Sequence, residues 1–77
     1  MATQSYQIVV KGLPLAAWAA RFEEAQILPL GSDRFLLRVV ISDQPALHGL
    51  LDRIRAVGLE LVSVKYFPLD KEEGNER

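Results

Sequence analysis

The stretch SDQPALHGLLDRIRAVG, residues 42–58, specifies one helix completely, because it contains the signals for both of its ends. Ser42 or Asp43 can cap the first turn, where Pro45 also fits, and Gly58 is typical of the position just past a helix end. Between these ends the apolar residues recur at helical spacing and form one stripe. We therefore predict a helix that runs to Val57 and buries Leu47, Leu50, Leu51, Ile54 and Val57.

Outward from this helix, four segments carry the alternating, β-branched-rich pattern that is typical of strands. Pro29 lies in one of them, and because proline cannot donate a ladder hydrogen bond, that strand should be at an edge of the sheet. The predicted strands are YQIVVK (6–11), AQILPL (25–30), RFLLRVVI (34–41) and LELVSVKYF (59–67).

A second helix is predicted over LAAWAARFEE, residues 15–24, because this segment is rich in alanine. Leu15, Trp18, Ala19 and Phe22 recur at helical spacing, and we expect Trp18 and Phe22 to complete the core. The order strand, helix, strand, strand, helix, strand predicts an α+β fold, the ferredoxin-like βαββαβ sandwich. Its four-stranded antiparallel sheet would carry both helices on one face, with the strands in the order last, first, third, second.

The whole chain of 77 residues suits one domain, which we expect to span residues 6–69. A flexible N-terminus (1–5) and a disordered, charged tail (70–77) would flank it. The absence of cysteine excludes disulfides and thiolate metal sites, and a single histidine cannot build a histidine-rich metal centre. The glycines form no phosphate-binding loop, so we expect no cofactor and no bound metal.

The balance of charge argues against two classes of partner. The net charge is −1, which favours neither nucleic acid nor an anionic membrane surface. IVVKGLP (8–14) resembles the first motif of RNA-recognition domains, but Val9 stands where an aromatic residue would stack on a base. No apolar run approaches the roughly 18 residues that span a bilayer. We expect a cytoplasmic protein without a nucleic-acid or membrane partner.

His48 is the one histidine, and it shares the outer face of the predicted helix with Asp52 and Arg55. A His48–Asp52 dyad for proton transfer is one interpretation, and a solvated helix surface that contacts a partner is the other. We favour the surface, because an outward helix face offers no pocket, and we expect a protein that is not an enzyme. Gly49 beside it either weakens the helix or allows another backbone to approach, within the fold or across an interface.

Apolar residues on the sheet predict self-association. In the last strand, Leu59 and Leu61 should point to one face and the next alternating residues to the other, so both faces of this edge strand are apolar. Unprotected apolar edges pair readily, and burial would add stability to a small chain without disulfides. We predict a homodimer, or binding to another protein, through Val9, Leu36, Val40, Val62, Val64 and Tyr66.

The sequence resembles a short, uncharacterised bacterial family whose signature is DQ-x-ALHGLL-x-RIR-x-LGL-x-L-x-SV. Residues 43–64, DQPALHGLLDRIRAVGLELVSV, carry this resemblance, together with the YxIxVKG start at Tyr6 and with Trp18. More distantly, VVISDQPALHGLLDRIRAVGLELVSV (39–64) is similar to the strand–helix–strand of ACT regulatory domains. That resemblance implies amino-acid sensing as the alternative function. The candidate ligand or partner loop would consist of Ser42, Asp43, Gln44, His48 and Asp52.

Overall fold

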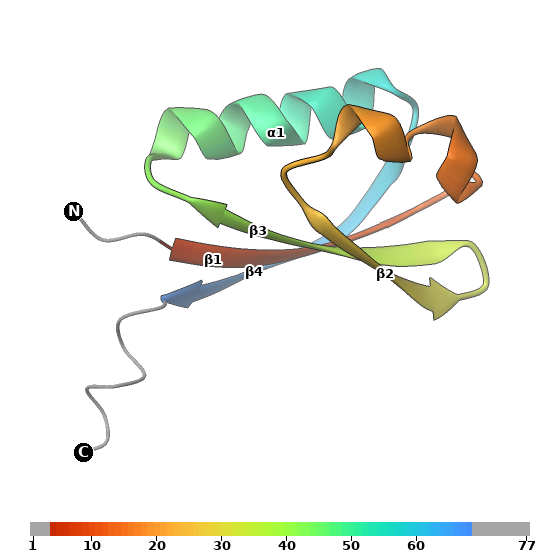
Figure 1. The fold of residues 1–77 in the computed structure, drawn as a ribbon, viewed down its shortest axis with the longest axis horizontal. Helices are drawn as coiled ribbons and strands as arrows, with labels where there is room; N and C mark the ends of the chain where they lie inside the picture. Colours follow the sequence, from red (N-terminus) through yellow and green to blue (C-terminus); the bar gives the residue numbers. More distant parts are fainter. Residues whose placement is uncertain (1–3, 69–77) are drawn as a thin grey trace, which may run out of the picture.

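The structure is a computed structural model, and it describes residues 4–68. The expected tail lies outside the described residues, whereas Gln4 and Ser5 of the expected flexible start already belong to the first strand. The elements, shown in Figure 1, are β1 (Gln4–Lys11), the 3-10 turns η1 (Leu15–Ala17) and η2 (Ala19–Arg21), β2 (Gln26–Gly31), β3 (Arg34–Ile41), α1 (Gln44–Ala56) and β4 (Glu60–Pro68).

All four strands form one antiparallel sheet in the order β2-β3-β1-β4. This confirms the predicted α+β class and the predicted strand order. Strand β2, which contains Pro29, lies at one edge, as the missing proline N–H requires. Helix α1 and the two 3-10 turns lie on the same face of the sheet, so that no other element of residues 4–68 covers the opposite face (Figure 1). We call that opposite side the open face.

The caps of α1 agree with the sequence. The Asp43 carboxylate accepts a hydrogen bond from the Ala46 N–H at 2.9 Å, which satisfies one of the free donors of the first turn. At the other end, Val57 is the C-cap, and Gly58 adopts a φ of +100°, which a residue with a side chain rarely does. The predicted helix is therefore confirmed, with its last helical residue at Ala56.

The predicted helix over 15–24 is wrong, because the chain forms the two single 3-10 turns there instead. Pro14 precedes the first turn and its side chain makes no capping hydrogen bond. Glu23 and Glu24 stand where the helix dipole would disfavour them. Because a ten-residue helix is marginal without such support, packing of Trp18 and Phe22 decides the backbone. The ferredoxin-like βαββαβ arrangement with two helices is thus not confirmed.

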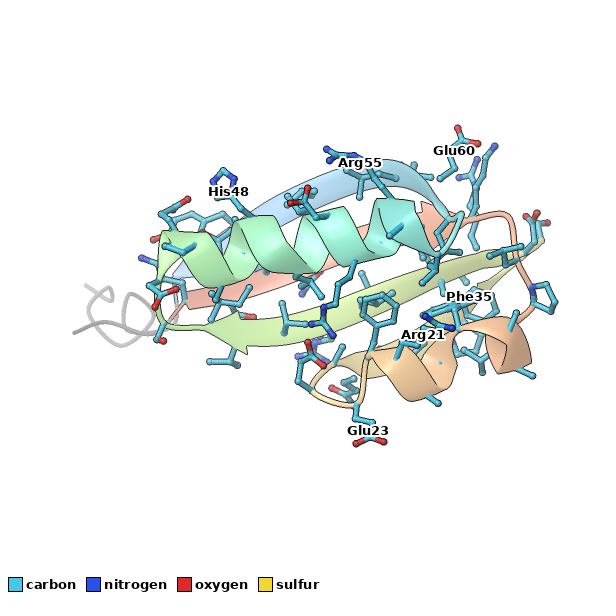
Figure 2. All side chains as sticks on the ribbon, turned by 90° about the horizontal axis from the view of Figure 1, so that it is seen from above. Arg21, Glu23, Phe35, His48, Arg55 and Glu60 are labelled. Atoms are coloured by element: carbon cyan, nitrogen blue, oxygen red, sulfur yellow. The ribbon has the colours of Figure 1, made fainter. Side chains whose placement is uncertain are left out.

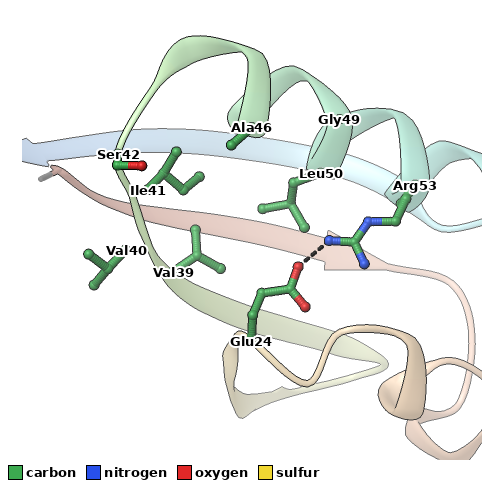
Figure 3. A pocket seen from close by; sticks show the side chains of 9 residues that line it. All are labelled: Glu24, Val39, Val40, Ile41, Ser42, Ala46, Gly49, Leu50 and Arg53. Carbon is green, nitrogen blue, oxygen red and sulfur yellow. Dashed lines mark hydrogen bonds and ion pairs between the residues drawn. The ribbon is translucent and has the colours of Figure 1, made fainter.

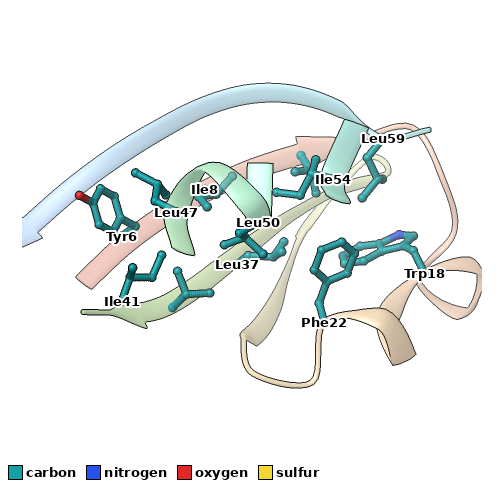
Figure 4. Packing of buried hydrophobic residues seen from close by; sticks show 12 residues of the cluster. Tyr6, Ile8, Trp18, Phe22, Leu37, Ile41, Leu47, Leu50, Ile54 and Leu59 are labelled. Atoms are coloured by element: carbon teal, nitrogen blue, oxygen red, sulfur yellow. The ribbon is translucent and has the colours of Figure 1, made fainter. Parts of the chain in front are cut away.

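The core fills the space between the sheet and the elements above it (Figure 4). Trp18 and Phe22 are buried there, as predicted, with their ring centroids 5.8 Å apart and the rings nearly perpendicular. The Trp18 indole N–H donates to the Leu13 carbonyl at 3.3 Å, which satisfies its one polar group. The remaining buried residues are Tyr6, Ile8, Val10, Leu37, Val39, Ile41, Leu47, Leu50, Ile54 and Leu59.

Candidate functional site

Strand β4 concentrates the exposed apolar surface of the molecule. Within residues 4–68, seven large hydrophobic side chains are exposed, and four of these belong to β4. This strand is also the edge of the sheet opposite β2, so one of its two sides has no partner strand in the described chain. It contains two charged residues, Glu60 and Lys65. The four exposed apolar residues of β4 are Val62, Val64, Tyr66 and Phe67.

A β-bulge in β4 determines which face each of these side chains occupies. Strand β1 pairs Val9 with Ser63 and the next residue, Val10, with Leu61, so Val62 is an extra residue in the ladder. Because residues opposite each other in a ladder share a face, Leu61 lies on the helix side and Ser63 on the open face. Val62 is the extra residue and has no partner of its own on β1, and we assign it, together with Ser63 opposite Val9, to the open face.

Because of the bulge, Val64 and Tyr66 face the side of the sheet opposite to the one that the sequence predicts. Val64 is opposite Ile8, and Tyr66 is opposite Tyr6, so both lie on the helix side rather than on the open face. The Tyr66 ring packs beside the Tyr6 ring with a centroid distance of 5.4 Å. Both side chains stay exposed, at 39% for Val64 and 49% for Tyr66, although their face is the one that α1 covers.

The open face is banded rather than uniformly apolar. Leu36 is opposite both Val9 and Leu28, which makes one apolar row across three strands. Val40 is opposite Ser5 in a separate row nearer the end of the sheet. Between these rows lies a polar one. It contains Gln26, Arg38, Gln7 and Lys65.

His48 lies exposed on α1, and Figure 2 shows that it extends to the same side of the helix as Arg55. Asp52 pairs with Arg55, with 3.3 Å between Oδ1 and Nη1, and no hydrogen bond within residues 4–68 joins Asp52 to His48. His48 also lies outside the groove described below. His48 and Asp52 therefore share a helix face, as the sequence predicts, without the hydrogen bond that the alternative interpretation as a dyad requires.

The residues of the candidate loop before α1 have different roles. The Asp43 carboxylate is engaged in capping the helix, and Gln44 is exposed in the first turn. Ser42 is exposed and lines a groove. Within residues 4–68, no hydrogen bond joins these loop residues to His48 or Asp52.

The groove lies between the end of β3, the first half of α1 and the segment after η2 (Figure 3). Its volume is about 590 Å³. Gly49 borders it, and a Cβ at this position would meet no heavy atom within 4 Å, so no backbone of the fold approaches Gly49. Its lining consists of Val39, Val40, Ile41, Ala46, Gly49 and Leu50, with Ser42, Glu24 and Arg53 as the polar members.

Arg53 links α1 to η2 and to the segment after it, which forms the opposite wall of the groove. Its Nη1 donates to the Arg21 carbonyl at 2.9 Å, and its Nη2 forms an ion pair with the Glu24 carboxylate (Figure 3). Its guanidinium carbon lies 5.1 Å from the centre of the Phe22 ring, in the range of a cation–π contact. Sequence reasoning missed Arg53 and Glu24, because their partners are far apart in the chain. The one signal is the position of Arg53 beside the buried stripe of the helix.

The pKa of the Glu24 carboxyl lies below its ordinary value of 4.5. Partial burial by itself raises this pKa, but a backbone hydrogen bond at Glu24 and the Arg53 guanidinium favour the ionised carboxylate and together outweigh burial. The polar end of the groove therefore presents one positive and one negative group at neutral pH. Both are already paired with each other.

Neither a metal-binding cluster nor a membrane-spanning helix is found in residues 4–68. Residues 4–68 contain no group of three or more histidine, cysteine, aspartate or glutamate side chains that could hold a metal ion. In the same range, α1 is neither long nor apolar enough to cross a membrane.

Comparison with known proteins gives one result. Searches among curated proteins and among solved structures find no significant match. A family described as a domain of unknown function (DUF8691) matches residues 5–65, a range that contains α1, β2 and β3 in full and most of β1 and β4. The chain therefore belongs to this uncharacterised family of short domains, DUF8691.

Proposed function

We propose that the chain is a non-enzymatic association domain that forms a homodimer by pairing the β4 edges of two copies. One observation carries this proposal: four of the seven exposed large hydrophobic side chains in residues 4–68 belong to one edge strand. Such an edge offers unpaired backbone groups beside apolar side chains, which is the surface that another strand covers. The opposite edge contains Pro29, which hinders pairing there.

Edge pairing is favoured over stacking of two open faces. The polar row with Arg38 and Lys65 separates the apolar row at Val9 and Leu36 from Val40. Stacking two such faces would bury these basic side chains against one another or against apolar rows, which costs desolvation free energy. In an edge-paired dimer, Val62, Val64 and Tyr66 form the junction. Val9 lies on the neighbouring strand β1, whereas Leu36 and Val40 lie on β3, outside the junction.

Sedimentation equilibrium over a range of concentrations tests the proposal. Val62→Lys should weaken self-association, because it places a charge on the junction. Val40→Lys is the matched control, since Val40 is equally apolar and more exposed, at 63%, but lies on β3 rather than at the edge. A dimer weakened by Val40→Lys and not by Val62→Lys would indicate face stacking. An unsubstituted chain that remains monomeric at tens of micromolar would refute the proposal.

The groove favours a second candidate function, sensing of a small amino acid in the manner of ACT domains. It lies beside the β3–α1 junction, where the ACT resemblance implies a ligand, and its polar end contains Arg53 and Glu24. A guanidinium and a carboxylate bind the two charged ends of an amino acid, so a ligand would replace the Arg53–Glu24 ion pair by one contact to each group. Calorimetric titration with a panel of amino acids tests this function. Saturable binding that Arg53→Met abolishes would support it, and no binding by any member of the panel would refute it.

A further inference from the structure

We propose that two copies pair their β4 strands in one two-fold register, centred between Val62 and Ser63, that sets Glu60 of each copy opposite Lys65 of the other. This inference rests on the proposed homodimer. It adds the alignment of the strands and the charge pair that selects a second copy of this chain over a foreign strand. The facing of the side chains and the placement of charge on β4 carry it independently.

The facing of β4 is irregular, and that irregularity limits the registers. At the bulge, Ser63 points to the open face, and Val62 is assigned to the same face. Leu61 and Val64, which flank them, both point to the helix side. Side chains of β4 therefore do not alternate strictly along its length. A partner strand that pairs along all of residues 59–66 matches it only if its own irregularity lies directly opposite.

A two-fold axis perpendicular to the sheet keeps the open faces of both copies on one side. Opposed residues of antiparallel strands share a face, so each opposed pair must have the same facing. With the axis between Val62 and Ser63, Val62 opposes Ser63 and Leu61 opposes Val64, and both pairs match. The helix-side residue Leu59 likewise opposes Tyr66. Every opposed pair between residues 59 and 66 is matched in this way.

Neighbouring registers fail this requirement. Shifting one strand by a single residue sets Leu61 opposite Ser63 in one direction and opposite Lys65 in the other, which places a helix-side residue against an open-face one. A shift by two residues confines the conflict to the central pair, Leu61 with Val62 or Ser63 with Val64, but it no longer sets Glu60 opposite Lys65. Because a slip of one residue exchanges the two faces of a strand, a mismatch would expose apolar side chains and bury polar ones.

Charge selects the same register. Glu60 and Lys65 are the two charged residues of β4, they have opposite sign, and both lie on the open face, where Glu60 is opposite Lys11 and Lys65 is opposite Gln7. In the face-matched register, Glu60 of one copy opposes Lys65 of the other on both sides of the axis. Opposite charges directly across a ladder stabilise a sheet, and like charges destabilise it. A second copy therefore complements β4 both in facing and in charge.

Charge reversal tests the register. Glu60→Lys and Lys65→Glu, each alone, should create two repulsive pairs in a dimer and raise its Kd roughly tenfold at low salt. An equimolar mixture of the two variants should form heterodimers, because each copy then complements the other at both positions. We expect the mixed dimer to regain the Kd of the unsubstituted chain within about twofold. Native mass spectrometry distinguishes mixed from homotypic dimers, and sedimentation equilibrium gives the Kd.

Arg38→Glu is the matched control, because it reverses one charge on the open face two strands away from the edge. Its Kd should equal that of the unsubstituted chain. Lys65→Glu is the more decisive of the two edge variants, since Glu60 also lies 4.0 Å from Lys11 within its own copy. Raising the salt concentration should reduce the differences between all the variants, because the charges are exposed.

Cross-linking reads the register directly, in a chain that has no cysteine of its own. Copies with Glu60→Cys mixed with copies with Lys65→Cys should form a disulfide between them, because opposed residues bring their Cβ atoms within about 5 Å. Either variant alone should cross-link much more slowly. If the dimer forms but neither charge reversal nor mixing alters its Kd, the register is wrong and the homodimer stands. If the unsubstituted chain stays monomeric, both fail.

Discussion

At the scale of single residues, Arg53 links parts of the chain that are distant in sequence. Its guanidinium joins α1 to the carbonyl of Arg21, to the carboxylate of Glu24 and to the ring of Phe22. None of these contacts is deeply buried, so each is worth little alone. Together they hold the segment of 3-10 turns, which lacks the regular hydrogen bonds of a helix, against the core.

Replacing Arg53 by methionine should therefore destabilise the fold by about 1–2 kcal/mol, because a hydrogen bond, an ion pair and a cation–π contact are lost while the apolar stem is kept. Urea unfolding followed by tryptophan fluorescence measures the effect. Arg55→Met is the control, since Arg55 makes an exposed pair with Asp52 on the same helix. A loss of stability as large for Arg55→Met would show that Arg53 has no special role.

The Glu24–Arg53 pair should also make stability depend on pH in the acid range. The pKa of Glu24 is lowered in the folded state, so folding favours the ionised carboxylate. The ionised Glu24 contributes fully to the free energy of unfolding at a pH above its pKa in the unfolded chain. This contribution is lost as the pH falls through the pKa of Glu24 in the folded chain, which lies below the ordinary value of 4.5. In Glu24→Gln this part of the acid destabilisation should disappear. Identical slopes of unfolding free energy against pH below 4.5 in both proteins would contradict this prediction.

Gly49 and Gly58 should respond to alanine in opposite directions. A Cβ at Gly49 meets no atom within 4 Å, so Gly49→Ala should stabilise α1 by roughly 0.5–1 kcal/mol. Gly58 has a φ of +100°, so Gly58→Ala should destabilise the fold. Thermal unfolding measures both. If Gly49→Ala weakens dimerisation or ligand binding in a protein that is still folded, the open space at this glycine belongs to an interface.

At the scale of elements, the sequence predicts an element well where local chemistry specifies it. The ends of α1 follow from Asp43 and Gly58, and the edge position of β2 follows from Pro29. The alternation of β1 and β3 places Ile8 and Leu37 in the core, as the structure has it. Each of these signals acts within a few residues, so a single sequence contains it.

Two features required information that local patterns do not contain. Alanine-rich residues 15–24 favour a helix by propensity, yet packing of Trp18 and Phe22 against the core imposes 3-10 turns. The bulge at Val62 depends on the ladder with β1, and it exchanges the face of every residue that follows it in β4. The sequence therefore indicates that β4 is apolar, but it does not predict the facing of Val64 and Tyr66.

Val64→Glu gives a prediction at this scale. Val64 lies on the helix side and is 39% exposed, so a glutamate there should weaken pairing of the edges without entering the closed core. We expect a higher Kd for dimerisation and a native circular dichroism spectrum. Val39→Glu is the contrasting variant on the same side of the sheet, because Val39 is buried and its replacement should unfold the chain. A Val64→Glu protein that unfolds as Val39→Glu does would mean that Val64 is part of the core.

At the scale of the whole molecule, one sheet has a covered face and an open face, and one of its edges is blocked while the other is apolar. The covered face provides the core, and Pro29 marks the blocked edge. A chain of 77 residues buries a small core, so covering β4 on association should add to its stability. Folding and dimerisation are then linked, and the midpoint of thermal unfolding should rise with protein concentration.

Sedimentation equilibrium of the unsubstituted chain and of Val62→Lys, combined with thermal unfolding of both at several concentrations, tests self-association through β4. We expect the unsubstituted chain to be dimeric at tens of micromolar, with a Tm that rises with concentration. Val62→Lys should be a folded monomer whose Tm does not change with concentration. An unsubstituted chain that is monomeric throughout, with a Tm independent of concentration, would contradict self-association through β4.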